Sequence, residues 1–416
     1  MKSFKPIRGT NDYGPKQERL REIVREKILK SYQSNGYNLI STPILESLEF
    51  LNSSEGGDNL RLMFKTIKRG DKLDLSKPNL AESDITEEGL RYDLTVPLTR
   101  FYLNNRDKLP NPFKAIQIGY SFRAERPQRG RDRQFIQCDI DIFGDNSINC
   151  ELELLKTAID TYNLLGFNNL TLKINSREIL NSIVLFAGFN ESDIVEICTT
   201  LDKIDKIDIT GVMMELVEKG YDTEKINKLI STVADIREKG LKSTLNYGAD
   251  KKVVNDLSYL ISTLKKLTNN ANIVYDISIV RGQGYYTGPI YEFYTEGFSG
   301  AIGAGGRYNN MVKKFAGVDV PACGASIGFE PVIMLLTERK ATFDAKENLA
   351  LLFEQDDDIV EVYSAKEDLK NNYNVSLYEK PKNMKNFYEK ISEVASFVTS
   401  FKDYKQNKPI KQLEEK

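Results

Sequence analysis

Carboxylates recur at alternate positions of a β-like run at residues 134–143, where apolar residues occupy the positions between them. Because successive side chains of a strand point to opposite faces, the polar residues of this run share one face. The pattern of residues 89–98 predicts a second strand, in which two polar residues also share a face. The residues aligned in this way are Gln137, Asp139 and Asp141 in the first run, and Asp93 and Thr95 in the second. Carboxylates beside an amide and a hydroxyl would suit a cationic ligand with several donors, such as the ammonium group of an amino acid. The alternative is a half-buried strand with a hydrated polar face.

An arginine-rich segment lies between two β-like runs, residues 114–122 and residues 134–143. This spacing predicts a β-hairpin with a long tip, residues 123–133 (RAERPQRGRDR). The tip holds five arginines, Arg123, Arg126, Arg129, Arg131 and Arg133. Because the guanidinium fork binds phosphate in a bidentate manner, this density favours binding of a polyphosphate or a nucleic acid. A solvated hairpin tip with an incidental charge cluster is the alternative.

Two glycine-rich segments contain aromatic and arginine residues: residues 281–288 (RGQGYYTG) and residues 303–308 (GAGGRY). Neither has the lysine of a P-loop or the GxGxxG spacing of a dinucleotide site. Glycine lets the backbone approach a ligand closely, so we expect the Arg and Tyr side chains to point into a site there. A pair of ordinary turns would have the same composition.

The composition excludes several kinds of chemistry. The chain has 416 residues and no histidine, which excludes Ser-His-Asp triads, HExxH zinc sites and histidine general bases. The four cysteines lie far apart without a CxxC pair, so no side-chain motif indicates a metal site. The formal net charge is −2, so any contact with nucleic acid must come from a local basic patch. No secretion signal and no run of ~20 apolar residues occurs, so we expect a cytoplasmic protein with no membrane partner.

The order of the periodic segments predicts an α+β protein with an interrupted β-rich core. Residues 15–35 have the apolar spacing of an amphipathic helix. Helical periodicity then dominates a long central stretch, after which β-like runs return. We therefore expect a core at residues 1–340 that contains a mainly helical insertion at about residues 175–268. The rest of the chain alternates β-like and helical segments, so we expect a small α/β domain at residues 341–416.

Taken together and in this order, these segments resemble the histidyl-tRNA synthetases, a family of class II aminoacyl-tRNA synthetases. The resemblance spans residues 8 to 330. The segments that carry it are RGTNDYGPKQ, NLISTPILE, LRYDLTVPLTRF, FRAERPQRGRDRQFIQCDIDIFG, RGQGYYTGPIYEF, GAGGRYNNMV and GASIGFE. The block FRAERPQ…RQF…Q, with RGxxYYTG and AGGRY, is highly specific.

The resemblance implies a core built on an antiparallel sheet that binds ATP and histidine side by side, with Mg²⁺ neutralising the β- and γ-phosphates. It implies a histidine–tRNA ligase, which activates L-histidine with ATP to histidyl-adenylate and transfers it to tRNA(His). The segment around Pro43 resembles motif 1 of the class, which forms the interface of a homodimer. The hairpin resembles motif 2, and the tail resembles an anticodon-binding domain.

The family motifs also imply roles for individual positions. The positions that match ATP ligands are Arg123, Glu125 and Arg131. Those that match histidine ligands are Asp93, Thr95 and Gln137 for the ammonium group, Asp141 and Tyr286 for the imidazole, and Tyr285 and Tyr308 in the pocket wall. Arg281 matches an arginine between the histidine carboxylate and the α-phosphate, so Arg281 and Arg123 would supply the catalytic positive charge. Arg126 and Gln128 match positions that contact the acceptor end of the tRNA.

Three features depart from the family pattern. Pro331 follows Glu330 where motif 3 has an arginine that holds the γ-phosphate, and Arg307 or Arg129 would then have to compensate as an ATP ligand. Gly284 replaces a carboxylate of the commoner RGLDYYTG. No arginine follows Arg339, so we expect a weak contact between the tail and the anticodon.

Two other functions stay open from the sequence alone. One is a non-catalytic paralogue that senses histidine, as the regulatory subunit of ATP phosphoribosyltransferase does. Pro331 favours it, whereas the retained motif 2 and RGxxYYTG segments and the tail favour the enzyme. The other is a tRNA-binding adaptor without chemistry.

Overall fold

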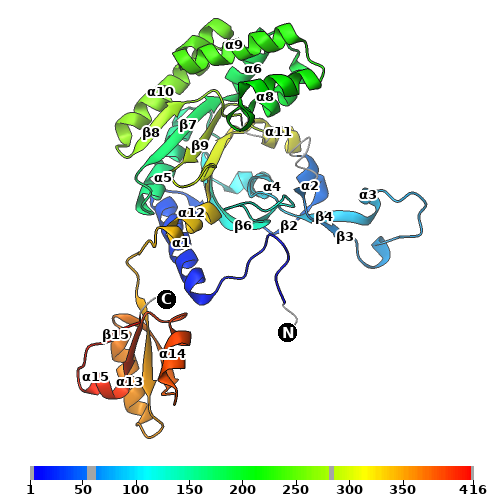
Figure 1. Cartoon of the computed structure of the whole chain (residues 1–416). Coiled ribbons are helices and arrows are strands. Elements are labelled where there is room, and N and C mark those ends of the chain that lie inside the picture. Colours follow the sequence, from blue (N-terminus) through cyan, green and yellow to red (C-terminus); the bar gives the residue numbers. More distant parts are fainter. Residues whose placement is uncertain (1–3, 54–61, 281–284, 414–416) are drawn as a thin grey trace. The chain divides into compact units, whose positions relative to one another are not determined.

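The chain folds into two compact units, and the computed structural model describes residues 4–53, 62–280 and 285–413 (Figure 1). One unit comprises Met1–Thr10 and Glu26–Glu338, and the other comprises Asn11–Arg25 and Arg339–Lys416. Helix α1 (Pro15–Ser34) confirms the helix that the apolar spacing predicted. No helix in the described part of the chain combines the length and apolar composition that a bilayer crossing requires.

An eight-stranded sheet forms the centre of the larger unit. In spatial order its strands are β1 (Asn38–Leu39), β5 (Phe113–Phe122), β6 (Gln134–Phe143), β11 (Ala322–Gly328), β10 (Gly303–Arg307), β9 (Pro289–Tyr294), β7 (Leu170–Ser176) and β8 (Ala271–Tyr275). Neighbours are antiparallel except at the edges, where β1 runs parallel to β5 and β7 runs parallel to β8. The expected antiparallel sheet is therefore mixed. Parallel neighbours need a long crossover connection, and the helical segment between β7 and β8 provides one.

Strands β5 and β6 form the hairpin that the sequence predicted. They pair without interruption from Phe113 opposite Phe143 to Phe122 opposite Gln134. The apolar residues of β6 from Ile136 onward are buried, and Tyr32 donates a hydrogen bond of 3.1 Å to the carbonyl oxygen of Cys138. The hairpin therefore extends its arginine-rich tip from the middle of a packed sheet.

A smaller sheet consists of β2 (Leu45–Ser47), β4 (Thr86–Leu90) and β3 (Lys65–Ile67). The prediction that residues 89–98 form one strand is wrong, because β4 ends at Leu90 and helix α4 (Thr95–Asn105) begins five positions later. A carboxylate oxygen of Asp93 accepts the backbone N–H of Val96 at 3.1 Å, which satisfies a donor of the first helical turn. Pro97 lies in that same turn, where its missing N–H costs nothing.

The α-helices of the larger unit cover the sheet and fill the crossover. Five of them, α6 to α10, lie between β7 and β8 in the sequence and group together beside these strands (Figure 1). They are α6 (Arg177–Phe186), α7 (Ile194–Leu201), α8 (Ile204–Glu218), α9 (Thr223–Lys239) and α10 (Lys251–Leu267). Besides α4 and the second half of α1, the other α-helices described in this unit are α2 (Leu48–Ser53), α3 (Glu82–Ile85), α5 (Asn149–Leu164), α11 (Asn310–Ala316) and α12 (Phe329–Glu338).

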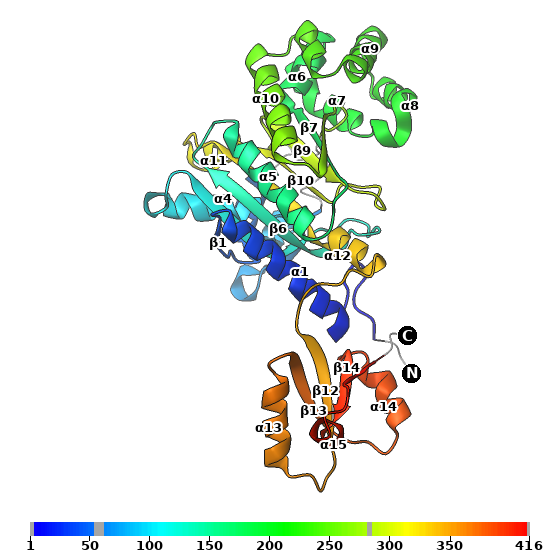
Figure 2. The same cartoon turned by 90° about the vertical axis from the view of Figure 1, so that its left-hand side faces the viewer.

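The smaller unit has a four-stranded sheet in the order β13-β12-β14-β15, parallel except for β15. Its elements are β12 (Glu347–Phe353), α13 (Ile359–Leu369), β13 (Tyr373–Glu379), α14 (Met384–Ile391), β14 (Phe397–Ser400), α15 (Phe401–Lys405) and β15 (Lys411–Gln412). Figure 2 shows α13 and α14 on opposite faces of the sheet. Leu349 and Leu351 pack with α13, whereas Ala350 and Leu352 pack with α14. Both faces of β12 are covered, which explains its continuous apolar run.

Candidate active site

A cavity of about 280 Å³ lies in the larger unit, lined by β6 and by the tip of the hairpin. It brings together most of the residues that the sequence singled out. Those lining it are Asp93, Thr95, Arg123, Glu125, Arg126, Arg131, Gln137, Asp141, Tyr285, Tyr286 and Tyr308. Gln128 and Arg307 do not line it, and Arg281 lies outside the described residues. Segments far apart in the sequence thus converge on one concave site.

The polar face of β6 forms the floor of the cavity. Asp141 lies opposite Gly324 of β11, and Asp139 lies opposite Ser326. A Cβ atom at Gly324 would lie only 1.9 Å from Oδ1 of Asp141, so glycine is needed for this carboxylate to lie over β11. The alternative of a hydrated strand face is wrong, because Asp139 and Asp141 are only 4% and 3% exposed.

The cavity contains buried hydrogen-bond acceptors that have no donor among the described residues. They are Oδ2 of Asp93, Oε1 of Gln137, Oδ1 of Asp139 and Oδ2 of Asp141. Buried polar atoms are nearly always paired in folded proteins, because an unpaired one loses its hydration without compensation. A cluster of unpaired acceptors therefore favours a ligand that brings several N–H donors and positive charge.

Burial raises the pKa of each of the three carboxyl groups in the cavity. Burial raises the pKa of Asp141 to about 7; the hydrogen bond from Tyr308 opposes this shift, and the charge of Asp93 adds to it. Burial, together with the charge of Asp141, raises the pKa of Asp139 well above its usual range. Burial also raises the pKa of Asp93, although the N–H of Val96 and the charge of Arg123 oppose it. A bound cation would let these carboxyls ionise.

Three arginines of the hairpin line the cavity: Arg123, Arg126 and Arg131. The Nε atom of Arg123 donates to the carbonyl oxygen of Tyr92 at 3.1 Å, and its guanidinium lies over the ring of Phe135. These contacts orient a cation beside the acidic floor. The site therefore has a basic end suited to phosphate and an acidic end suited to an ammonium group.

The other two hairpin arginines are bound elsewhere. Arg129 pairs with Glu338 at 2.7 Å, and both side chains are about half exposed. The backbone N–H of Arg133 donates to the carbonyl oxygen of Gly9 at 2.7 Å, and its guanidinium lies over Phe64. Arg129 is therefore not positioned as a substitute for the missing motif 3 arginine.

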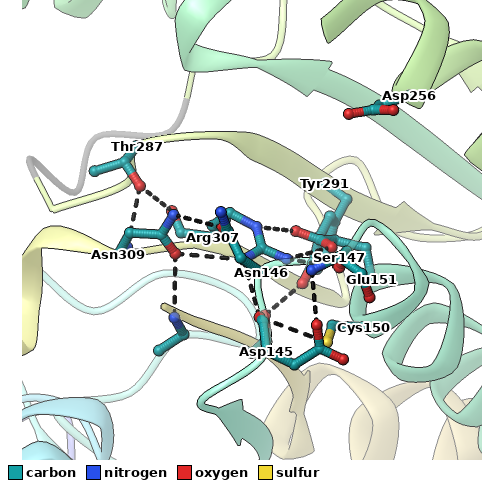
Figure 3. Close-up of polar contacts among 12 residues, drawn as sticks. Asp145, Asn146, Ser147, Cys150, Glu151, Asp256, Thr287, Tyr291, Arg307 and Asn309 are labelled. Carbon is teal, nitrogen blue, oxygen red and sulfur yellow. Dashed lines mark hydrogen bonds and ion pairs between the residues drawn. The ribbon is translucent and has the colours of Figure 1, made fainter. Parts of the chain in front are cut away.

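Arg307 also has a different role from the one suggested for it as an ATP ligand. Its guanidinium is 7% exposed and forms a bidentate ion pair with Glu151, at 2.6 Å from Nε and 2.7 Å from Nη2 (Figure 3). The remaining N–H groups donate to the carbonyl oxygens of Asp145 and Ser147 and to amide oxygens nearby. This guanidinium is fully engaged within the fold and does not line the cavity, so it is not available to a phosphate there.

Sequence reasoning missed two buried charges near the site. Glu151 occupies the apolar stripe of α5 with Leu154, Leu155 and Ala158, and a carboxylate in such a stripe signals a buried ion pair. Arg91 is 5% exposed and donates to the carbonyl oxygens of Thr42 at 2.8 Å and Tyr120 at 2.8 Å. The one sequence signal for the buried Arg91 was its position between apolar residues, Leu90 and Tyr92.

A large mixed sheet with flanking helices is consistent with the fold of a class II aminoacyl-tRNA synthetase. Residues 9–332 match the sequence model of the family described as Histidyl-tRNA synthetase. The chain belongs to the histidyl-tRNA synthetase family.

Individual proteins agree with this assignment. The chain is 38% identical to a histidine–tRNA ligase of Leifsonia xyli over 343 residues, which is 80% of either chain. It is 39% identical to a probable histidine–tRNA ligase of Tropheryma whipplei over 361 residues, 83% of either chain. The crystal structure of histidyl-tRNA synthetase from Nostoc sp. PCC 7120 superimposes with a TM-score of 0.77 at 24% identity, covering 99% of this chain and 95% of that one. At this identity the superposition shows the fold.

Proposed function

We propose that this chain is a histidine–tRNA ligase, which activates L-histidine with ATP and transfers it to tRNA(His). The observation that carries the proposal is the pairing of opposite chemistries in one cavity. Unpaired carboxylate and amide acceptors lie at one end, and arginines of the hairpin lie at the other. An amino acid with an imidazole offers the donors that the acidic end lacks, and ATP offers the anion that the basic end lacks.

The acidic end would bind histidine through two groups of residues. Asp93, Thr95 and Gln137 would accept hydrogen bonds from the ammonium group. Asp141 and Tyr308, which already share a hydrogen bond, would bind the imidazole together with Tyr286. Tyr285 would close the wall, since its ring centroid lies 5.9 Å from that of Tyr308. Histidine would thus satisfy acceptors that are otherwise buried without a donor.

The basic end would bind ATP and stabilise the first reaction. The histidine carboxylate attacks the α-phosphorus, which forms histidyl-adenylate and releases pyrophosphate. This step brings two anions together, so positioning and positive charge supply most of the rate enhancement. Arg123 would stabilise the α-phosphate from one side and Arg281 from the other, while Glu125 would face the adenine and Arg131 the remaining phosphates.

Mg²⁺ would accompany ATP and neutralise its β- and γ-phosphates. The described residues contain no group of three or more acidic, Cys or His side chains that could hold a metal ion by themselves. The ATP phosphates would therefore supply most of its ligands, as is usual for Mg²⁺.

The second reaction would transfer histidine to tRNA. A terminal ribose hydroxyl of tRNA(His) attacks the adenylate carbonyl, and an oxygen of the leaving phosphate can take the proton. No histidine base is needed, which agrees with a chain that contains none. Arg126 and Gln128 would contact the acceptor end, and residues 341–416 would contact the anticodon.

We also propose a homodimer that assembles through the segment around Pro43. Leu39, Ile44 and Leu45 flank this segment and are exposed by 48%, 41% and 48% of their surface. Apolar side chains gathered in this way favour burial against a second copy. Residues 1–340 would form the catalytic core of each subunit, acting in the cytoplasm.

Histidine-dependent exchange of pyrophosphate into ATP tests the proposed function. We expect exchange with histidine and none with histidinol, which keeps the ammonium and imidazole groups but lacks the attacking carboxylate. Aminoacylation of tRNA(His) would then test the second step. A chain that binds histidine but supports no exchange would instead be a histidine-sensing regulatory subunit, and one that binds tRNA without histidine would be an adaptor.

A further inference from the structure

A buried ion pair lies behind the aromatic wall of the cavity, outside the residues that line it. Glu151 is fully buried at the start of α5, and Arg307 is the last residue of β10. Figure 3 shows the guanidinium of Arg307 between the carboxylate of Glu151 and the loop at residues 145–147. The ion pair therefore joins the end of β10 to α5 and to the loop that precedes α5, although Glu151 and Arg307 are 156 positions apart in the sequence.

The same strand end also holds the two segments that carry the pocket tyrosines. The carbonyl oxygen of Arg307 accepts the backbone N–H of Thr287 at 2.8 Å, directly after Tyr286. The hydroxyl of Thr287 accepts the N–H of Asn309 at 3.1 Å, directly after Tyr308. The side chain of Asn309 in turn accepts the N–H of Ala322 on β11 at 3.1 Å. Tyr286 and Tyr308 are thus each followed directly by a residue whose backbone N–H is held by this network.

Stability alone gives little reason for such an ion pair. Desolvation of two charges offsets most of their attraction, so a buried pair is often no more stabilising than apolar residues of similar size. The pair does fix an orientation, because its bidentate geometry holds the Arg307 side chain in one position against Glu151.

We propose that Glu151 and Arg307 are positioning residues for histidine binding: they hold the end of β10 so that Tyr308 meets Asp141 and Tyr286 faces the ligand. This inference rests on the proposed function and adds two residues to it. The contact at stake is the hydrogen bond of 2.5 Å from the Tyr308 phenol to Oδ1 of Asp141. A displacement of about 1 Å would break it, and misplacement on that scale can reduce a rate about 100-fold.

The pH dependence of histidine binding reports on this contact. The groups that face Asp141 are Asp139 on the same strand, Asp93 before α4, and Tyr308 after β10; the nearby cation Arg123 acts on Asp139 and Asp93. Among them, Tyr308 donates to Asp141 and lowers its pKa. Loss of that hydrogen bond should raise this pKa, so the acidic limb of kcat/KM for histidine should move to higher pH.

The test compares Glu151→Gln with wild type in histidine-dependent exchange, at several pH values. We expect kcat/KM for histidine to fall about 10- to 100-fold, with KM for ATP changed less than about threefold. The acidic limb should move to higher pH, as it should in Tyr308→Phe. Both changes would disrupt the same hydrogen bond, between Tyr308 and Asp141. The loss of kcat/KM in the double variant Glu151→Gln/Tyr308→Phe should therefore be smaller than the product of the two single losses. Unchanged kcat/KM and an unchanged pH profile in Glu151→Gln would overturn the proposal.

A second variant separates positioning from stability. Glu151→Met combined with Arg307→Met removes both charges, so it should fold even if the single variants do not. We expect a melting temperature near that of wild type with a persistent defect in histidine binding. Recovery of wild-type kcat/KM along with stability would show that the pair only stabilises the fold, and would overturn the proposal.

Glu215→Gln is the matched control. It removes an ion pair of 2.7 Å with Lys203 in the helical insertion, which contributes no residue to the cavity. Its kcat/KM for histidine should equal that of wild type. Calorimetric titration of wild type with histidine distinguishes the two levels of failure. Absent binding by wild type overturns the proposed function and this inference together, whereas normal binding with an unaffected Glu151→Gln overturns the inference alone.

Discussion

The phenol of Tyr308 donates a hydrogen bond of 2.5 Å to Oδ1 of Asp141, although the two residues are 167 positions apart in the sequence. Asp141 lies on β6 and Tyr308 follows β10, with β11 between these strands. Gly324 on β11 leaves the space through which they meet. The hydrogen bond orients the Asp141 carboxyl within the buried cavity. Its other oxygen, Oδ2, has no donor among the described residues.

Asp141→Asn should weaken the use of histidine more than the use of ATP. The amide must turn its NH₂ group either to the imidazole or to the Tyr308 phenol, which leaves a buried polar group unpaired. We expect kcat/KM for histidine to fall by about 1–3 kcal/mol, roughly 5- to 150-fold. Steady-state exchange kinetics with each substrate varied would measure this, and an unaltered KM for histidine would show that Asp141 does not bind the ligand.

The stability of the ligand-free chain should depend on pH through Asp141. Its pKa is about 7, above the ordinary value of 3.8. A carboxyl whose pKa is raised by folding stabilises the fold when protonated, so the contribution is complete below about pH 4 and is lost as pH rises through about 7. Asparagine does not titrate. The melting temperature of wild type minus that of Asp141→Asn should therefore fall between about pH 4 and pH 7 and level off above. Scanning calorimetry without ligand would check this, and a difference that stays constant or rises would contradict it.

Arg123→Ala should remove most adenylate formation while weak histidine binding persists. This side chain supplies charge that matters most when the α-phosphorus is attacked, so we expect a loss of about 2.7–4 kcal/mol, or 10²–10³ in rate. Arg281→Ala should behave alike, a prediction that rests on the sequence. Arg129→Ala is the matched control, because Arg129 does not line the cavity and its exposed ion pair with Glu338 should contribute under about 1 kcal/mol to stability. Its exchange rate should equal that of wild type. Equal exchange rates in wild type, Arg123→Ala and Arg281→Ala would refute the assignment.

Pro331→Arg should increase the affinity for ATP. Pro331 lines the cavity beside Gly130 of the hairpin tip, and neither Arg129 nor Arg307 replaces the guanidinium that motif 3 usually provides. A charge-assisted hydrogen bond to the γ-phosphate would contribute about 1.5–3 kcal/mol, or roughly 10- to 150-fold in dissociation constant. Titration calorimetry with ATP and Mg²⁺ would measure it. No gain would mean that Arg126 or Arg131 already holds this phosphate.

The chain should sediment as a dimer. The exposed apolar residues beside Pro43 would be buried in the interface, so the mass at micromolar concentration should be about twice 47.4 kDa. Replacing Ile44 and Leu45 by Asp should shift the equilibrium toward monomer, because each charge would be desolvated on association. A single-chain mass for wild type over the same range would exclude this interface.

Local patterns predicted the elements whose signals are contained in a few neighbouring residues. The apolar spacing of residues 15–35 was sufficient for α1, and alternation was sufficient for the hairpin of β5 and β6. The segment around Asp93 was predicted wrongly, because its apolar pattern suits a strand whereas Asp93 and Pro97 favour a helical turn. A strand pattern and a helix-start pattern can thus overlap in one short segment, and tertiary contacts determine which structure forms.

The residue types and their spacing define the chemistry available to this protein: no imidazole, arginines in one hairpin, and carboxylates on one strand face. The sequence also identifies the family, since the match to the family extends over residues 9–332. Which of these groups meet depends on how distant segments pack in the folded chain. Arg307 belongs to a conspicuous motif, yet its guanidinium binds Glu151 rather than the cavity. Asp139 and Asp141 share a strand face that could have been hydrated, yet both are buried. Burial and partner choice depend on pairing between distant strands and helices, and these contacts set the pKa values and leave the unpaired acceptors that define the site.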